Sequence, residues 1–140
     1  MSDANPYFDA LKAINLEVQA WYTGVAEANA LDRLMARFSP QFSMVLPTGG
    51  TLDFATLRDI FAQHGGHRPG FAIEITSQVV VADYPCGAVV TYCERQSDGD
   101  VTLNLRRSTA VFERDAHGNV LCRHLQETFY ADEAPPCTFM

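Results

Sequence analysis

The chain has 140 residues, of which 47% are hydrophobic and 19% charged, and its formal net charge is −7. This length and apolar content fit one domain with a single core, and the acidic surface argues against a nucleic-acid partner. Apolar runs are far shorter than the roughly 20 residues of a membrane-spanning helix. No basic segment followed by an apolar one marks the N-terminus, so we expect a cytoplasmic protein without a membrane partner.

The first part of the chain carries helical patterns. Asn5 followed by Pro6 is typical of a helix start, and apolar residues then recur every three or four positions up to Val25. A second apolar stripe predicts a helix over residues 31–38, which Pro40 would stop. A strand is therefore expected only after this proline.

A short strand and a third helix complete this part. Side chains alternate between apolar and polar over residues 42–46, as in a strand, and residues 51–52 favour a second short one. Asp53 is a typical N-cap for a helix over residues 54–64, and Gly65 would end it.

Four longer strands follow, joined by short turns, and are therefore antiparallel. They are expected over residues 71–82, 87–96, 101–113 and 120–130. Strands of this length would curve and wrap the helices. Several are apolar on both faces, which favours a homodimer that covers the outer face of the sheet with a second copy of the chain. The domain is expected to span residues 1–132, and residues 133–140 a C-terminal tail.

Three stretches of this sequence resemble the nuclear transport factor 2-like superfamily. They are residues 34–42 (LMARFSPQF), 107–115 (RSTAVFERD) and 121–128 (LCRHLQET). The likeness is closest to the SnoaL-like branch and to related small domains of unknown function. This resemblance implies an α+β, cystatin-like fold: three N-terminal helices packed on a strongly curved, mixed, mostly antiparallel sheet that forms a cone with an internal pocket.

The resemblance has two departures. Val120 stands where the family often has a tryptophan, and Gln126 where it often has a second histidine. Because the superfamily includes enzymes and binding modules, the fold does not select the activity. The chain is interpreted as a small-molecule-binding domain with an unassigned pocket ligand. The alternative is an isomerase, dehydratase or polyketide-cyclase-like enzyme acting by proton abstraction. No cofactor is expected.

His124 is the candidate catalytic residue. Enzymes of the superfamily commonly abstract a proton next to a carbonyl, which needs a base in a dry pocket and donors for the developing oxyanion. A histidine in the middle of a strand could serve as that base, or could be a core or dimer-face residue with a hydrogen-bonded neighbour.

The candidate ligand pocket comprises Tyr22, Tyr92, Arg106, Gln126 and Glu127. Counting back from the last hairpin places Arg106 opposite Glu127, either as a pocket carboxylate held by an arginine or as an ordinary surface ion pair. A one-residue change of register would exchange the faces.

Two further groups have both a functional and a structural interpretation. Tyr92 and Glu94 share a strand face and could form an acid–base pair, or could be a core tyrosine and a strand-end charge. His64 and His67 lack a third ligand at a defined spacing, so a loop with solvated histidines is favoured and no metal is expected.

Overall fold

The computed structural model describes residues 5–131, so the expected tail lies outside the described residues. The extent of the domain stays a prediction. The described part contains three helices, which are α1 (Pro6–Thr23), α2 (Ala30–Met35) and α3 (Phe54–His64). Its six strands are β1 (Phe38–Val45), β2 (Thr51–Asp53), β3 (Phe71–Tyr84), β4 (Gly87–Asp98), β5 (Val101–Arg114) and β6 (Val120–Phe129).

Two helix starts follow the predicted capping chemistry. The Asn5 side chain accepts hydrogen bonds from the backbone N–H groups of Tyr7 and Phe8, and Asp53 accepts one from Thr56. These bonds satisfy N–H groups that have no partner within a helix. Helix α1 ends at Gly24, whose φ of 83° is the left-handed conformation that glycine adopts readily.

The predicted second helix is wrong beyond Met35. Helix α2 ends there, and strand β1 already begins at Phe38, so Pro40 lies inside a strand and does not mark its approach. The interaction that overrides the local helical pattern is long-range. Phe38 pairs with Cys122 of β6, and the Cys122 N–H donates to the carbonyl oxygen of Arg37 over 2.9 Å.

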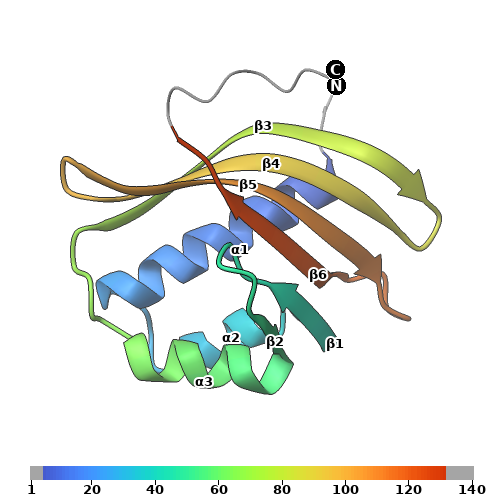
Figure 1. The fold of residues 1–140 in the computed structure, drawn as a ribbon. Helices are drawn as coiled ribbons and strands as arrows, with labels where there is room; N and C mark the ends of the chain where they lie inside the picture. Colours follow the sequence, from blue (N-terminus) through green and yellow to red (C-terminus); the bar gives the residue numbers. More distant parts are fainter. Residues whose placement is uncertain (1–4, 132–140) are drawn as a thin grey trace.

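The strands form one mixed sheet in the order β2-β1-β6-β5-β4-β3. Only the β1–β6 pair is parallel, and the other four pairs are antiparallel, within the described residues. The helices all lie on one face of the sheet, with α1 running beneath β3, β4 and β5 (Figure 1). The α+β class and the mostly antiparallel sheet are therefore as predicted.

The predicted strong curvature of the sheet is wrong. Strands β3, β4 and β5 run side by side as long, gently bent ribbons (Figure 1). The space beneath them is closed instead by α1, α3 and the short strands β1 and β2, which contribute Met44 and Leu52 to the wall of a cavity. The cavity is thus enclosed by helices and short strands, and not by a strongly curved sheet.

Strand β6 contains one extra residue relative to β5. Cys122 pairs with Phe112, but the next pair is His124 with Val111, so Arg123 has no partner in the ladder. Such a bulge reverses the alternation of side chains after it. Cys122 lies on the helix side, and beyond the bulge Leu125 takes that side in place of His124.

None of the helices within residues 5–131 is both long and apolar enough to cross a membrane.

Candidate functional site

A cavity of about 420 Å³ lies between the helices and the inner face of the sheet. Most of its wall is apolar, since α1 contributes Leu11, Ile14 and Val18 and α3 contributes Leu57 and Phe61. These residues belong to the apolar stripes of the two helices, and all of them except the partly buried Val18 are buried.

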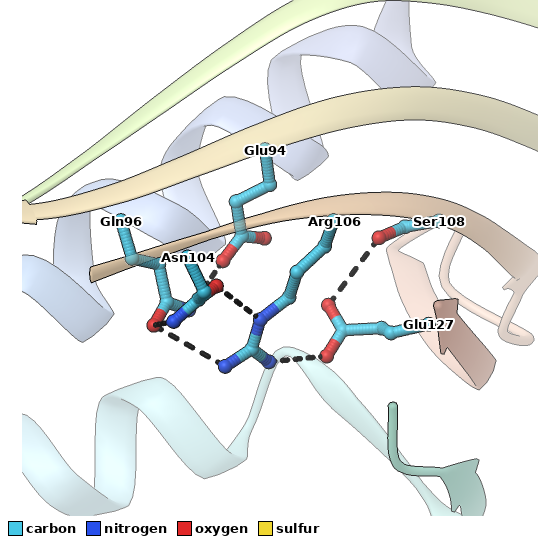
Figure 2. Close-up of polar contacts among 6 residues, drawn as sticks. All are labelled: Glu94, Gln96, Asn104, Arg106, Ser108 and Glu127. Carbon is cyan, nitrogen blue, oxygen red and sulfur yellow. Dashed lines mark hydrogen bonds and ion pairs between the residues drawn. The ribbon is translucent and has the colours of Figure 1, made fainter. Parts of the chain in front are cut away.

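One wall of the cavity is polar. It is built on three adjacent strands, with Glu94 and Gln96 on β4, Asn104, Arg106 and Ser108 on β5, and Glu127 on β6 (Figure 2). Successive members of a strand are two residues apart, so they share the inner face. Cross-strand pairing brings them together, as in Glu94 with Arg106 and Ser108 with Glu127.

Arg106 is held by three neighbours at once. Its Nη1 donates to Glu127 Oε1 over 2.7 Å, its Nε to Asn104 Oδ1 over 2.8 Å, and its Nη2 to Gln96 Oε1 over 3.3 Å (Figure 2). The ion pair is nearly out of solvent, with 18% of the Arg106 side chain and 5% of the Glu127 side chain exposed. Ser108 Oγ also donates to Glu127 Oε2 over 3.4 Å. The charge of Glu127 is therefore compensated within the protein.

Glu94 is a second buried carboxyl and has no ion pair within the described residues. It is 4% exposed, and its Oε2 accepts a 2.5 Å hydrogen bond from Gln96 Nε2. Burial and the nearby charge of Glu127 raise the pKa of Glu94 from 4.5 to about 7, although Gln96 and Arg106 act in the opposite direction. Glu94 thus changes its protonation near neutral pH.

Two tyrosines complete the polar part of the lining. Burial raises the pKa of Tyr92 well above its usual value, and the carboxylates of Glu94 and Glu127 raise it further. Burial also raises the pKa of Tyr22, partly offset by the charge of Arg106. Both phenols are therefore neutral hydrogen-bond donors at physiological pH.

The structure brings four of the predicted pocket residues to the cavity. Tyr22, Tyr92, Arg106 and Glu127 all line it. Arg106 and Glu127 are not opposite each other, because Arg106 pairs with Phe129 and Ser108 with Glu127, and they meet diagonally. The predicted register was thus off by two residues, while the predicted contact is present.

The structure does not bring His124 or Gln126 to the cavity. The bulge at Arg123 turns both side chains to the outer face of β6, where Gln126 is exposed. His124 Nδ1 lies 2.6 Å from Ser43 Oγ of the neighbouring strand β1. Its expected role as a pocket base has no geometric support, and the alternative of a histidine with a hydrogen-bonded neighbour matches its surroundings.

Sequence reasoning missed the amide and hydroxyl members of the wall, Gln96, Asn104 and Ser108. The available signal was their spacing. Tyr92, Glu94 and Gln96 occupy every second position of one strand, and Asn104, Arg106 and Ser108 every second position of the next, so each set lies on one face. Glu94 was considered, but its burial was not predicted. Within residues 5–131 no group of three or more His, Cys, Asp or Glu side chains is placed to hold a metal ion.

Known structures share this architecture. An NTF-2-like protein of unknown function from Pseudomonas aeruginosa is 41% identical to this chain with a TM-score of 0.87, and the match covers 91% of this chain and 100% of that one. The chain belongs to the nuclear transport factor 2-like family. No family model and no curated protein matches the sequence.

More distant structures of the family show the fold alone. An NTF2-like protein from Cytophaga hutchinsonii is 15% identical with a TM-score of 0.72, covering 93% of this chain and 100% of that one. One with a cystatin-like fold from Novosphingobium aromaticivorans is 9% identical with a TM-score of 0.73, covering 92% and 82%. The cystatin-like fold implied by the sequence resemblance is thereby confirmed.

The raised pKa of Glu94 predicts a pH-dependent effect of the substitution Glu94→Gln. Folded Glu94 holds its proton up to about pH 7 and the unfolded residue only to about 4.5, so ionisation of Glu94 destabilises the fold as pH rises through this window. The neutral amide avoids that cost. We expect E94Q to gain stability over the native chain between pH 5 and pH 8, by on the order of 3 kcal/mol, in urea unfolding.

The matched control is Glu74→Gln, at an exposed position on β3. Its stability relative to the native chain should be the same at both pH values. An E94Q variant whose relative stability also does not change with pH would show that Glu94 has an ordinary pKa.

Proposed function

We propose that this protein binds a small, largely apolar organic molecule in the cavity beneath the sheet. The observation that carries the proposal is the combination of an apolar chamber with a polar wall containing two buried carboxyl groups, Glu94 and Glu127. Burying carboxyl groups costs folding free energy, and a core meant only for stability would be filled with apolar side chains. An open chamber lined by such groups is typical of a ligand site.

The size of the chamber sets the size of the ligand. A volume of about 420 Å³ lies within the range of known small-molecule sites and equals that of roughly 14 molecules of liquid water. This suits a molecule with one or two rings. The apolar side chains of α1 and α3 would contact its body, and the wall of β4, β5 and β6 its polar group.

A second candidate function is proton-transfer catalysis of the isomerase, dehydratase or polyketide-cyclase kind. It is favoured by the pKa of about 7 for Glu94, since a general base works best when its pKa is near the ambient pH. The neutral phenol of Tyr22 also lines the cavity and could donate to a developing oxyanion. In this candidate Glu94 takes the role that the sequence assigned to His124.

We also propose that the protein is a homodimer through the outer face of the sheet. The helices leave this face uncovered (Figure 1), and its centre is formed by Val89 and Thr91 of β4 paired with Val111 and Thr109 of β5. Arg107 and Glu113 flank this centre at its two ends, and they are on the same side of β5. A second copy related by a two-fold axis would bring these opposite charges together.

Binding in the cavity is tested by filling it. The substitution Val18→Trp adds a large ring to the α1 side of the chamber, so small-molecule stabilisation in a thermal-shift screen of small acids, amines and ketones should be lost. Leu16→Trp, on the same helix at a position 54% exposed, should leave it intact. Circular dichroism checks that both variants fold. Hits that persist unchanged in folded V18W would place binding elsewhere and contradict the proposal.

The dimer is tested by sedimentation equilibrium at micromolar concentrations. We expect the native chain to sediment at twice its monomer mass and Thr91→Arg, at the centre of the outer face, to sediment as a monomer. Gln63→Arg, at an exposed position on α3, is the control and should remain dimeric. A native chain that is monomeric at high micromolar concentration would refute the dimer.

A further inference from the structure

The charges that face the cavity do not balance. Its lining contains two buried carboxyl groups, Glu94 and Glu127, but one largely buried cation, Arg106, whose side chain is 18% exposed. The other cation of the lining is Arg68, which follows α3, and 49% of its side chain is exposed while it pairs with Asp98 over 3.0 Å. When Glu94 is ionised, the interior therefore carries one negative charge without a partner.

Arg106 is poorly placed to receive an anionic ligand. Each of its three guanidinium nitrogens already donates to a side chain, to Glu127, Asn104 and Gln96. An anion that reached the remaining N–H groups of Arg106 would lie next to the carboxyl groups of Glu127 and Glu94, which would repel it when ionised. Displacing Glu127 from Arg106 would break a largely buried ion pair, which is unfavourable.

Glu94, in contrast to Arg106, is well placed to contact a ligand, because one of its carboxyl oxygens has no hydrogen bond within the described residues. Gln96 occupies Oε2, and the second oxygen has no hydrogen bond in Figure 2. No side-chain oxygen or nitrogen within the described residues is both fully buried and without a hydrogen-bond partner, so this oxygen opens into the cavity. A carboxyl group that is 4% exposed overall thus presents its one unsatisfied acceptor to a ligand.

The apolar part of the cavity is compatible with a positive charge nearby. Tyr22 packs against Phe71 with ring centroids 5.2 Å apart and against Phe61 at 6.2 Å, and all three side chains line the cavity. Aromatic rings attract cations through their negative faces. The net charge of −7 would also concentrate cations around the protein.

We infer that the ligand carries a cationic head group, a protonated amine, which pairs with the free oxygen of Glu94 while the apolar body fills the chamber. This inference rests on the proposed binding function and specifies its ligand class. With the amine bound, the two carboxylates, Arg106 and the ammonium group form a cluster of zero net charge. The ammonium also donates to the carboxyl oxygen that lacks a donor in the protein.

The charged and titratable groups around Glu94 determine how binding responds to pH. Glu127 on β6, Tyr92 on β4 and Tyr22 on α1 line the cavity with Arg106 and Arg68. The raised pKa values of the two tyrosines keep both phenols protonated between pH 6 and pH 8. An aliphatic amine also stays protonated over this interval, since its pKa is near 10. Glu94, with a pKa of about 7, is the group of the lining that we expect to titrate in this interval.

Three probes with one carbon skeleton test the inference. They are 3-phenylpropylamine, 3-phenylpropan-1-ol and 3-phenylpropanoate, titrated into the native protein and followed by NMR. We expect the amine to bind most tightly, with an affinity that increases roughly tenfold from pH 6 to pH 8 as Glu94 ionises. In E94Q the amine should lose about tenfold in affinity at pH 8 and its dependence on pH, whereas E74Q should behave like the native chain.

The remaining outcomes separate the inference from the proposed function. If the alcohol binds as tightly as the amine, or if the affinity for the amine falls as pH rises, the cationic ligand is refuted. Protonated Glu94 would then donate a hydrogen bond to a neutral acceptor. Preferred binding of the carboxylate would refute it as well, since an arginine would then receive the head group. If none of the probes and no member of the thermal-shift screen shifts the cavity resonances of the folded protein, the proposed binding function itself fails.

Discussion

The extra residue at Arg123 determines which side chains of β6 reach the cavity. In a regular strand Cys122, His124 and Gln126 would share the inner face, and Glu127 would point outward. The bulge places Leu125 and Glu127 inside instead. This shift completes the polar wall, because Glu127 holds Arg106 by an ion pair and adds to the effect of burial in raising the pKa of Glu94.

The polar wall is a single connected network. Gln96 links its two halves, since its amide nitrogen donates to Glu94 while its oxygen accepts from Arg106 and Asn104 (Figure 2). Networks of this kind are costly when one member is removed, because the remaining groups stay buried without partners. The arrangement fixes the side chains in place before a ligand arrives, and such preorganisation reduces the entropic cost of binding.

The outcome for the sequence predictions depended on how local each signal was. Capping at Asn5 and Asp53 and the alternation of the long strands are properties of neighbouring residues, and both were read correctly. The start of β1 at Phe38 was misjudged because it is set by parallel pairing with a strand more than 80 residues away in the chain.

The predictions of pocket residues also succeeded where the signal was local and failed where it was long-range. Tyr22, Tyr92, Arg106 and Glu127 were identified, yet the sequence could not say which face of β6 lines the chamber. No sequence pattern marks a bulge at Arg123, so residues of both faces of β6 were named as candidates, and His124 and Gln126 lie on the outer face. Glu94 was weighed as a strand-end charge because its burial depends on the helices that pack across the sheet.

The central claim is that Glu94 is a buried carboxyl without an ion pair, next to a second carboxyl that has one. Its most direct test is the titration of the Glu94 side-chain carboxyl carbon by ¹³C NMR in the ligand-free native protein. We predict a midpoint near pH 7 for this carbon. A midpoint near 4.5, the ordinary value for glutamate, would mean that Glu94 is solvated or compensated, and would contradict the account.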